Sequence, residues 1–560
     1  MQKSNLNILS RRSFLDRSAK TSLAIALSTL VDIPFVMKRA LAEGNIGLNG
    51  KKVLFIWLRG ANDSLNSVIP IQDPAYASSR PTLQIPPDPA GYGTSGPAFV
   101  PVMSNDPTSG NFPTYHFGNA ISLGNTFAAL HPSLKFLAPV YNAGELALVH
   151  RVAYPKQSRS HFDSQNYWEN GNPNNDLSKD GIFYRTIIES GLANTSPLTG
   201  VSIQSALPLI LRGNDAALTN LTDPTRYDLL ALPHPAGDIK SDNALIAANT
   251  YPFAPKKNRE LLSLQYENMQ NTLGLPLFSG GGAQFMESAN TFRDDVITDN
   301  DTAWAAANGS EGYYLFPTTN VKNGGWRRPD GSNAANKYAV DPGHQGFFNN
   351  LKAAALVLNN TNAIIAGTEL NGFDTHKGQG GVTGNNPNTH PQLNKTIGWA
   401  MYALKKYFTR YHGNVAWNDV VVITLSEFGR TTIENSDAGT DHAEAGVMFV
   451  GGGAIQGYNK PKPSGNVTGV FNCGSPSDST VWDIANSPMF GVSGRYLQRA
   501  TDYRSVLGEI IRKHLGATQN QLNRIIPGYV PASNEQLLAG GTSGVDNTTI
   551  TGEVGILPGT

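Results

Sequence analysis

Acidic and imidazole side chains are concentrated in five short segments of this 560-residue chain. Carboxylate oxygens together with imidazole nitrogens suit zinc, manganese or iron, whereas calcium or magnesium is favoured if the histidines take no part. The sequence therefore predicts a divalent metal ion as cofactor, either zinc, manganese, calcium or magnesium. The predicted metal ligands are Asp63, Asp374, His376, Glu427, Asp441 and His442.

The spacing of these residues indicates how they could act together. Asp374 and His376 stand two residues apart, which lets both point to the same side of an extended chain. Asp441 and His442 are adjacent, so both can bind one ion only from an irregular loop. Ser160 precedes His161, and a neighbouring imidazole or metal ion could lower the proton affinity of its hydroxyl. We therefore predict Ser160 and His161 as catalytic residues.

Three of these predictions have a structural alternative. Asp63 could cap a helix that starts near Leu65. Glu427 could form a local ion pair with Arg430. His161 could be a structural histidine with satisfied hydrogen bonds.

Continuous apolar runs of strand length lie next to the five polar segments. Such runs suit strands that are buried on both faces of a sheet. They occupy residues 53–58, 146–149, 363–366, 420–425 and 447–450, and helical patterns lie between them at residues 134–141, 347–358, 392–411 and 503–515. The alternation predicts an α/β fold with a mostly parallel central sheet flanked by helices.

Four of the five polar segments follow a predicted strand. Ligands of open α/β sheets bind outside the carboxyl ends of the strands, so we expect these loops to converge. The segment with Asp441 and His442 precedes its strand instead. It can reach the same edge only if the strand at residues 447–450 runs antiparallel or the loop folds back over the sheet.

The domain organisation is expected to be simple. Residues 43–530 read as one large domain, and residues 205–330 form an irregular insertion that is predicted to be a cap or inserted subdomain. The tail at residues 531–560 has low hydrophobicity and is predicted to be flexible.

Residues 1–42 have the pattern of a twin-arginine signal peptide. Arginines at positions 11 and 12 precede a moderately apolar run, and residues 40–42 form a small-x-small cleavage site. A membrane anchor would need roughly 20 apolar residues, and this stretch is interrupted by Asp32, Pro34 and Lys38. We therefore expect the twin-arginine export machinery as a partner, and a periplasmic or secreted protein without a stable membrane anchor.

Composition argues against nucleic-acid binding and against sites built from cysteine. Basic and acidic residues balance at 43 each and no basic patch stands out, which argues against nucleic acid as a partner. The single cysteine, Cys473, cannot form an intrachain disulfide and provides too few ligands for a thiolate metal site. Any metal ion must therefore be held by oxygen and imidazole.

The five segments, in this order, resemble an exported family known as domain of unknown function 1501. The resemblance extends from about residue 50 to residue 530. Ser64 and Ala443 stand where the family usually has glycine. The segments that carry the resemblance are Asn62–Asn66, Arg159–Phe162, Phe373–His376, Ser426–Thr431 and Gly439–His442.

That family is similar to the alkaline phosphatase and sulfatase superfamily, which implies an alkaline-phosphatase-like fold. The superfamily usually has an Asp-His pair where this chain has Glu427-Phe428, so one imidazole of a two-metal site is missing. The Cys-x-Pro-x-Arg motif of sulfatases is absent from the sequence. By resemblance the metal positions fall on Asp63, Asp374, His376, Glu427 and His442.

Two functions are compatible with this pattern. The first is a metal-dependent hydrolase of phosphate or sulfate esters, of small molecules or polysaccharides, in the cell envelope. The ion would polarise the ester oxygen, and Ser160 or a metal-bound hydroxide would attack. The second is a non-catalytic exported binding protein that keeps the fold with a degenerate metal site. The expected convergence of loops favours the enzyme, whereas the missing imidazole favours the binding protein.

Overall fold

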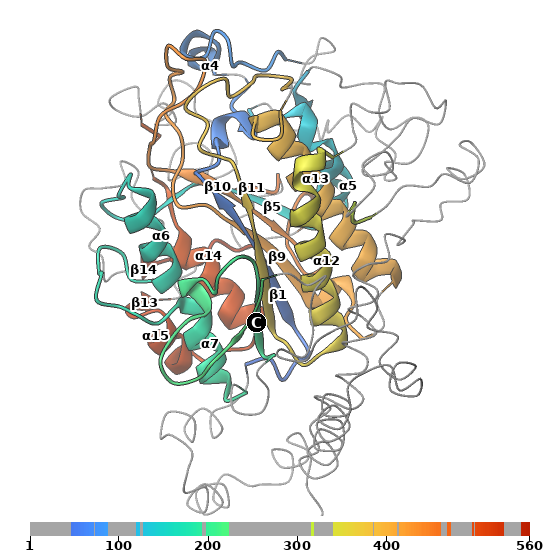
Figure 1. Cartoon of the computed structure of the whole chain (residues 1–560), viewed down its shortest axis with the longest axis vertical. Helices are drawn as coiled ribbons and strands as arrows, with labels where there is room; N and C mark the ends of the chain where they lie inside the picture. The colour runs from blue at the N-terminus through green and yellow to red at the C-terminus, as the bar shows by residue number, and fades with distance from the viewer. Residues whose placement is uncertain are drawn as a thin grey trace, which may run out of the picture.

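The centre of the computed structural model is a sheet built from the predicted apolar runs (Figure 1). Its central strand, β1 (Lys52–Arg59), is buried from Lys52 to Leu58. It pairs in parallel with β8 (Ile365–Asn371) on one side and with β9 (Val420–Leu425) on the other. The structure describes residues 46–71, 73–87, 119–123, 127–192, 198–222, 315–317, 340–384, 386–411, 414–460, 468–471, 496–497, 499–530 and 550–559.

Within these residues the sheet has nine strands, in the order β11, β5, β10, β9, β1, β8, β6 and β7, with β12 paired to β5. The remaining strands are β5 (Leu146–Ala153), β6 (Gly200–Ile203), β7 (Thr219–Leu221), β10 (Gly446–Gly451), β11 (Val470–Phe471) and β12 (Thr501–Asp502). The prediction of a mostly parallel sheet is therefore confirmed.

Among the described strands of this sheet, β10 alone runs against the others. It pairs antiparallel with β5 and β9, whereas the remaining pairings are parallel. Gly446, at its start, lies opposite Val152, near the end of β5. The loop before β10 therefore reaches the edge at which β1, β5, β8 and β9 end. The loop with Asp441 and His442 therefore reaches this edge because β10 runs antiparallel, which is one of the two arrangements expected from the sequence.

Helices cover both faces of the sheet (Figure 1). Neighbouring residues of a strand point to opposite faces, and in β1 Leu54 and Ile56 pack with α5, α12 and α13, whereas Val53 and Phe55 pack with α6, α7, α14 and α15. Turns of π-helix continue α13 and α14 at residues 407–411 and 510–514. The helices are α5 (Ala138–Asn142), α6 (His161–Asn170), α7 (Ile182–Ser190), α12 (Gln345–Asn360), α13 (His390–Lys406), α14 (Tyr503–Glu509) and α15 (Gln519–Ile525).

Shorter elements complete the described part. The helix α4 (Pro74–Ser79) follows β1 closely in the chain. Single stretches of 3-10 helix occupy residues 64–66, 132–137, 209–211, 342–344 and 417–419. A small antiparallel sheet consists of β2 (Val68–Ile69), β4 (Ala129–Leu130) and β3 (Ile121–Ser122).

Residues 550–559, the described part of the predicted tail, pack against the rest of the protein. Strand β14 (Ile550–Thr551) pairs in parallel with β13 (Tyr529–Val530). Ile556 and Leu557 are buried in the core around α14 and α15. Glu553 accepts a 2.6 Å hydrogen bond from Arg512. Ile556 and Leu557 thus anchor the described part of this segment to the core.

Several predicted features lie outside the described residues. The signal peptide at residues 1–42 and Cys473 are among them, and the insertion at 205–330 is described only at residues 205–222 and 315–317. Within the part of the chain that the structure does describe, no helix combines the length and apolar character needed to span a membrane.

Candidate metal centre

Three imidazoles and one carboxylate come together at the carboxyl edge of the sheet. Nε2 of His442 lies 3.0 Å from Nε2 of His161 and 2.9 Å from Nε2 of His376. Oδ1 of Asp374 lies 3.1 Å from Nε2 of His442, 3.1 Å from Nε2 of His376 and 3.5 Å from Nε2 of His161. His442 and Asp374 therefore form the middle of the cluster, and each of the other two imidazoles contacts both.

The sheet topology explains why residues so far apart in sequence meet here. His161 is the first residue of α6, which follows β5. Asp374 and His376 follow β8, and His442 precedes the antiparallel β10. Strands β5 and β8 end at the edge where β10 begins, so their loops converge as expected.

The other nitrogen of each imidazole faces an oxygen acceptor. Carbonyl and carboxylate oxygens only accept hydrogen bonds, so these contacts assign the proton of each neutral imidazole to Nδ1. The lone pair of each Nε2 is then directed into the cluster. The three contacts join Nδ1 of His161 to Oε1 of Glu427 at 2.8 Å, Nδ1 of His376 to Oδ1 of Asp441 at 3.2 Å, and Nδ1 of His442 to the carbonyl of Arg159 at 2.9 Å.

The Nε2 lone pairs of the three histidines and the negative charge of Asp374 face one another. A bound cation or protons must offset their mutual repulsion. Hydrogen bonds to Asp374 and Glu427 raise the pKa of His161 to about 9. Partial burial raises the pKa of Asp374, but hydrogen bonds from His161, His442 and Arg430 outweigh it and hold that pKa well below its ordinary value. Without a metal ion the cluster therefore retains a proton at neutral pH, and a divalent ion would have to displace it.

The spacing of the donor atoms fits a divalent ion. The ligand atoms of His161, Asp374 and His442 all lie within 4.8 Å of one another. In a tetrahedral zinc site with metal–nitrogen distances of about 2.0–2.1 Å, ligand atoms are about 3.3–3.4 Å apart. The separations of 3.0, 3.1 and 3.5 Å among these three residues are close to that value. His376 adds a further nitrogen beside them, and a set rich in imidazole suits zinc or manganese better than calcium or magnesium.

The cluster is buried at its base and open to solvent on one side. The exposed fraction is 49% for the side chain of Asp374 and 41% for that of His376, against 0% for those of Glu427 and Arg430. The ring of Phe428 lies below, with its centroid 4.8 Å from those of His161 and His442. A molecule from solvent can therefore reach the donor atoms.

Arg430 joins the loops of the cluster from beneath. Its buried guanidinium donates to Oδ1 of Asp374 at 2.5 Å. It also donates to backbone carbonyls of the loops after β1, after β8 and before β10, namely those of Gly60, Ala61, Phe373 and Thr440. The ion pair considered between Arg430 and Glu427 is thus replaced by one with Asp374, which fixes the orientation of that carboxylate.

Two glycines allow these loops to touch. Gly60 has a φ of +107°, and a Cβ at this position would collide with the backbone nitrogen of Asp374. A Cβ at Gly439 would collide with the carbonyl of His376. A larger residue at either position would push a loop of the cluster away from its neighbour.

Glu427 and Asp441 do not reach the cluster themselves but hold two of its imidazoles. Oε1 of the fully buried Glu427 accepts from His161, from the backbone nitrogen of Gly60 at 2.8 Å and from Gln165 at 3.0 Å. Burial raises the pKa of Glu427, but the hydrogen bond from His161 and the other donors lower it below its ordinary value. Both residues were predicted as metal ligands, and the geometry gives them the role of orienting acceptors.

Asp63 lies apart from the cluster. Its carboxylate accepts from Arg80 at 2.6 and 3.0 Å and from Gln379 at 2.6 Å, and it is fully buried. It also accepts from the backbone nitrogen of Leu65 at 3.2 Å, which caps the 3-10 turn at residues 64–66. The helix-cap alternative therefore describes its position. Arg80 and Gln379, its main partners, carry no signal in the sequence that would have identified them.

Ser160 caps helix α6 and does not pair with His161. Its Oγ accepts from the backbone nitrogen of Asp163 at 3.4 Å. Both ring nitrogens of His161 are engaged, one with Glu427 and one with the cluster. The imidazole is therefore not placed to take a proton from Ser160, and its Nε2 faces the cluster instead.

The model of a protein family matches residues 325–459. Its description is Protein of unknown function (DUF1501). The chain resembles this family. The matched segment includes Asp374, His376, Glu427, Asp441 and His442, but it begins after His161 in the chain. Comparisons with curated proteins and with solved structures gave no match.

Proposed function

We propose that this protein is a metal-dependent hydrolase of phosphate or sulfate esters that works in the cell envelope. The observation that carries the proposal is the meeting of Nε2 of His161, His376 and His442 with Oδ1 of Asp374 at a point open to solvent. Imidazoles whose outer nitrogens are held by carboxylate or carbonyl oxygens are typical of metal sites. The position of the cluster, at the carboxyl edge of a mostly parallel sheet, supports an alkaline-phosphatase-like fold.

In this proposal His161, Asp374 and His442 hold the ion, and His376 adjoins it. A divalent ion here would supply Lewis acidity to the ester oxygen and lower the pKa of a nearby water molecule. Glu427 and Asp441 keep the Nδ1 protons of His161 and His376 in place, so that both Nε2 lone pairs stay available. Arg430 keeps Oδ1 of Asp374 at the centre.

Water is the proposed nucleophile, because Ser160 is engaged as the cap of α6. Water attacks phosphorus or sulfur, the bond from that atom to the ester oxygen breaks, and an alcohol and inorganic phosphate or sulfate leave. The open side of the cluster, where Asp374 and His376 are about half exposed, would admit the ester group. Export through the twin-arginine machinery remains part of the proposal, based on residues 1–42.

A non-catalytic metal-binding protein is the second candidate. The separation of Ser160 from His161 removes the nucleophile that the sequence suggested. If His376 also moves onto the ion, four protein donors saturate a tetrahedral site and leave no position for substrate. Structural zinc sites are closed in this way, whereas catalytic sites keep one position open.

Metal analysis and ester hydrolysis test both candidates. The purified full chain is stripped with chelator, reloaded with zinc or manganese, and assayed with 4-nitrophenyl phosphate and 4-nitrophenyl sulfate. We expect bound metal, hydrolysis that chelator abolishes, and recovery on adding the ion back. Bound metal without hydrolysis of either ester supports the second candidate. A protein that takes up no ion under loading conditions rules out both.

A further inference from the structure

A pocket of about 430 Å³ adjoins the metal centre. Asp374 belongs to both, since its carboxylate is part of the cluster and its residue lines the pocket. Lys377, three residues further along the same loop, lines the pocket as well. The volume lies within the roughly 300–1,000 Å³ that is usual for pockets that hold small molecules. A group bound here would therefore sit next to the proposed ion.

The lining of this pocket is small and polar. Apart from one proline, its lining residues are glycines or carry a hydroxyl, an amide or a charge, and none is aromatic or a large aliphatic residue. Pockets for aryl or acyl groups are lined mostly by hydrophobic and aromatic side chains. Side-chain amides and hydroxyls instead donate to and accept from hydroxyl groups. The lining is thus suited to a hydroxyl-rich ligand.

The far wall is a turn that places two asparagines. Oδ1 of Asn386 accepts from the backbone nitrogen of Asn388 at 3.1 Å, and its carbonyl accepts from that of Thr389 at 3.1 Å. Gly372 has a φ of +113°, and a Cβ there would lie 2.8 Å from Oδ1 of Asn388. The amide of Asn388 therefore rests against the backbone at the end of β8, beside the loop that carries Asp374.

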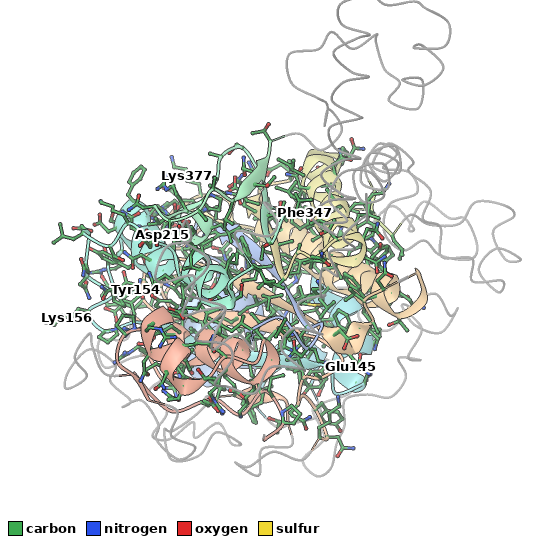
Figure 2. All side chains as sticks on the ribbon, turned by 90° about the horizontal axis from the view of Figure 1, so that it is seen from below. Glu145, Tyr154, Lys156, Asp215, Phe347 and Lys377 are labelled. Atoms are coloured by element: carbon green, nitrogen blue, oxygen red, sulfur yellow. The ribbon has the colours of Figure 1, made fainter. Side chains whose placement is uncertain are left out.

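Lys377 is the cation of the pocket lining. The start of α13, at Thr389, also borders the pocket, but its backbone offers little to an anion. The nitrogen of His390 donates to Gln379 and that of Gln392 to Thr389, and residue 391 is proline. Recognition of negative charge is therefore left to Lys377 and the neighbouring ion. Figure 2 shows Lys377 at the outer rim of the molecule, well away from Glu145.

We propose that this pocket binds the alcohol part of the ester, and that the substrates are phosphate or sulfate esters of sugars or polyols. Asn388 contacts the hydroxyl groups, and Lys377 contacts the anionic group between the pocket and the ion. This inference rests on the proposed function and adds the class of alcohol to it.

The test compares sugar esters with aryl esters on the zinc-loaded full chain. The substrates are glucose 6-phosphate and glucose 6-sulfate, set against 4-nitrophenyl phosphate and 4-nitrophenyl sulfate. The variants are Lys377→Ala and Asn388→Ala. The matched control is Lys51→Ala, which removes the same charge just before β1, at the opposite edge of the sheet.

We expect Asn388→Ala to lower kcat/KM for the preferred glucose ester about tenfold and to leave the nitrophenyl ester unchanged, because one hydrogen bond to the alcohol is lost. Lys377→Ala should lower kcat/KM about tenfold or more for both kinds of ester, and Lys51→Ala should change neither. The pair of glucose esters shows whether phosphate or sulfate is preferred. If Asn388→Ala changes kcat/KM equally for glucose and nitrophenyl esters, or for neither, the inference is overturned. The proposed hydrolase function is not affected by that result.

If no ester is hydrolysed, the proposed function fails and binding decides the inference separately. Calorimetry then measures the affinity of the zinc-loaded protein for glucose 6-phosphate. Weaker binding in Lys377→Ala and Asn388→Ala, but not in Lys51→Ala, supports the pocket as a sugar ester site. The same affinity in all four proteins, or no binding, overturns it.

Discussion

Nε2 of Gln379 donates a 2.6 Å hydrogen bond to Oδ2 of Asp63, and both side chains are fully buried. Oε1 of the same glutamine accepts from the hydroxyls of Thr375, at 2.9 Å, and Thr440, at 2.6 Å. Thr375 lies between Asp374 and His376 of the cluster, and Thr440 precedes Asp441, which accepts a hydrogen bond from His376. Gln379 therefore joins the two loops that carry Asp374, His376 and His442 to the buried ion pair of Asp63 with Arg80.

Removal of the Asp63 carboxylate should destabilise the fold. In Asp63→Ala the guanidinium of Arg80 stays buried without its counter-charge, and we expect the free energy of unfolding to fall by about 3–5 kcal/mol. Urea unfolding followed by circular dichroism measures the change. The control is Asp215→Ala, at an exposed position, where we expect a change within about 0.5 kcal/mol. A loss at Asp63 no larger than at Asp215 would contradict the buried ion pair.

The same residue separates a structural aspartate from a metal ligand. Asp63→Asn keeps the shape of the side chain, and the folded fraction of this variant should bind zinc with the affinity of the wild type. Equilibrium dialysis measures that affinity. A large loss in folded protein would restore Asp63 to the ligand position that the family resemblance implies.

The sequence was a good guide to the sheet for a simple physical reason. Strands buried on both faces must be apolar throughout, and the runs at residues 53–58 and 420–425 became the adjacent strands β1 and β9. The direction of β10 could not be read in this way, because its run of apolar residues is the same in either orientation. That direction decides whether His442 reaches the cluster.

The roles of the site residues were harder to predict than their convergence. Glu427 and Asp374 are both carboxylates that follow parallel strands, yet one holds an imidazole and the other contacts three. The difference lies in the path that each loop takes after its strand, which residue types do not encode. The bond from Gln379 to Asp63 spans 316 positions of the chain and involves residue types with many other uses.

Substitution of His442 should weaken zinc binding more than substitution of any other proposed ligand, because its Nε2 contacts both other imidazoles and Asp374. We expect His442→Ala to weaken zinc binding at least about a hundredfold, since a ligand is lost from the middle of the set. Competition with a fluorescent zinc chelator measures the affinity. His344→Ala is the control, because His344 is buried against Thr396 and away from the cluster. Equal affinities in the two variants would mean that the ion binds elsewhere.

Glu427 should affect zinc binding less than His442 does. Glu427→Gln keeps an oxygen that can accept from Nδ1 of His161 but removes the negative charge, and changes of this kind typically cost about 10–100-fold in metal affinity. Asp441→Asn should behave in the same way through His376. Dialysis against zinc at a fixed pH compares both with wild type. An effect of Glu427→Gln as large as that of His442→Ala would indicate that Glu427 binds the ion directly.

Acid should destabilise the fold through buried histidines outside the cluster of His161, His376 and His442. Burial lowers the pKa of His131 to about 3 and those of His150, His390 and His514 to about 4. In the unfolded chain histidine takes up a proton near pH 6.5. The unfolded state therefore binds more protons as the pH falls from 6.5 towards 4, and the stability that is complete above pH 6.5 is lost across that window.

The variant His514→Gln isolates one of these protons. It should reduce the slope of unfolding free energy against pH by about 1.4 kcal/mol per pH unit between pH 6 and pH 4.5. Glutamine can still donate to the carbonyl of Lys52, as His514 does. Urea unfolding of the metal-free protein at several pH values measures the slope. The same slope in variant and wild type would mean that His514 is already protonated in the native state.

Ser160 distinguishes a water nucleophile from a serine nucleophile. Ser160→Ala removes the oxygen that caps α6 and should lower the free energy of unfolding by about 1 kcal/mol. Ser160→Asn also provides a capping oxygen, so its free energy of unfolding should be close to that of the wild type. Both variants should keep the kcat of the wild type towards 4-nitrophenyl phosphate, because in the proposed reaction the serine hydroxyl forms no bond to phosphorus. A loss of kcat in both variants, with a wild-type free energy of unfolding in Ser160→Asn, would indicate that Ser160 is the nucleophile.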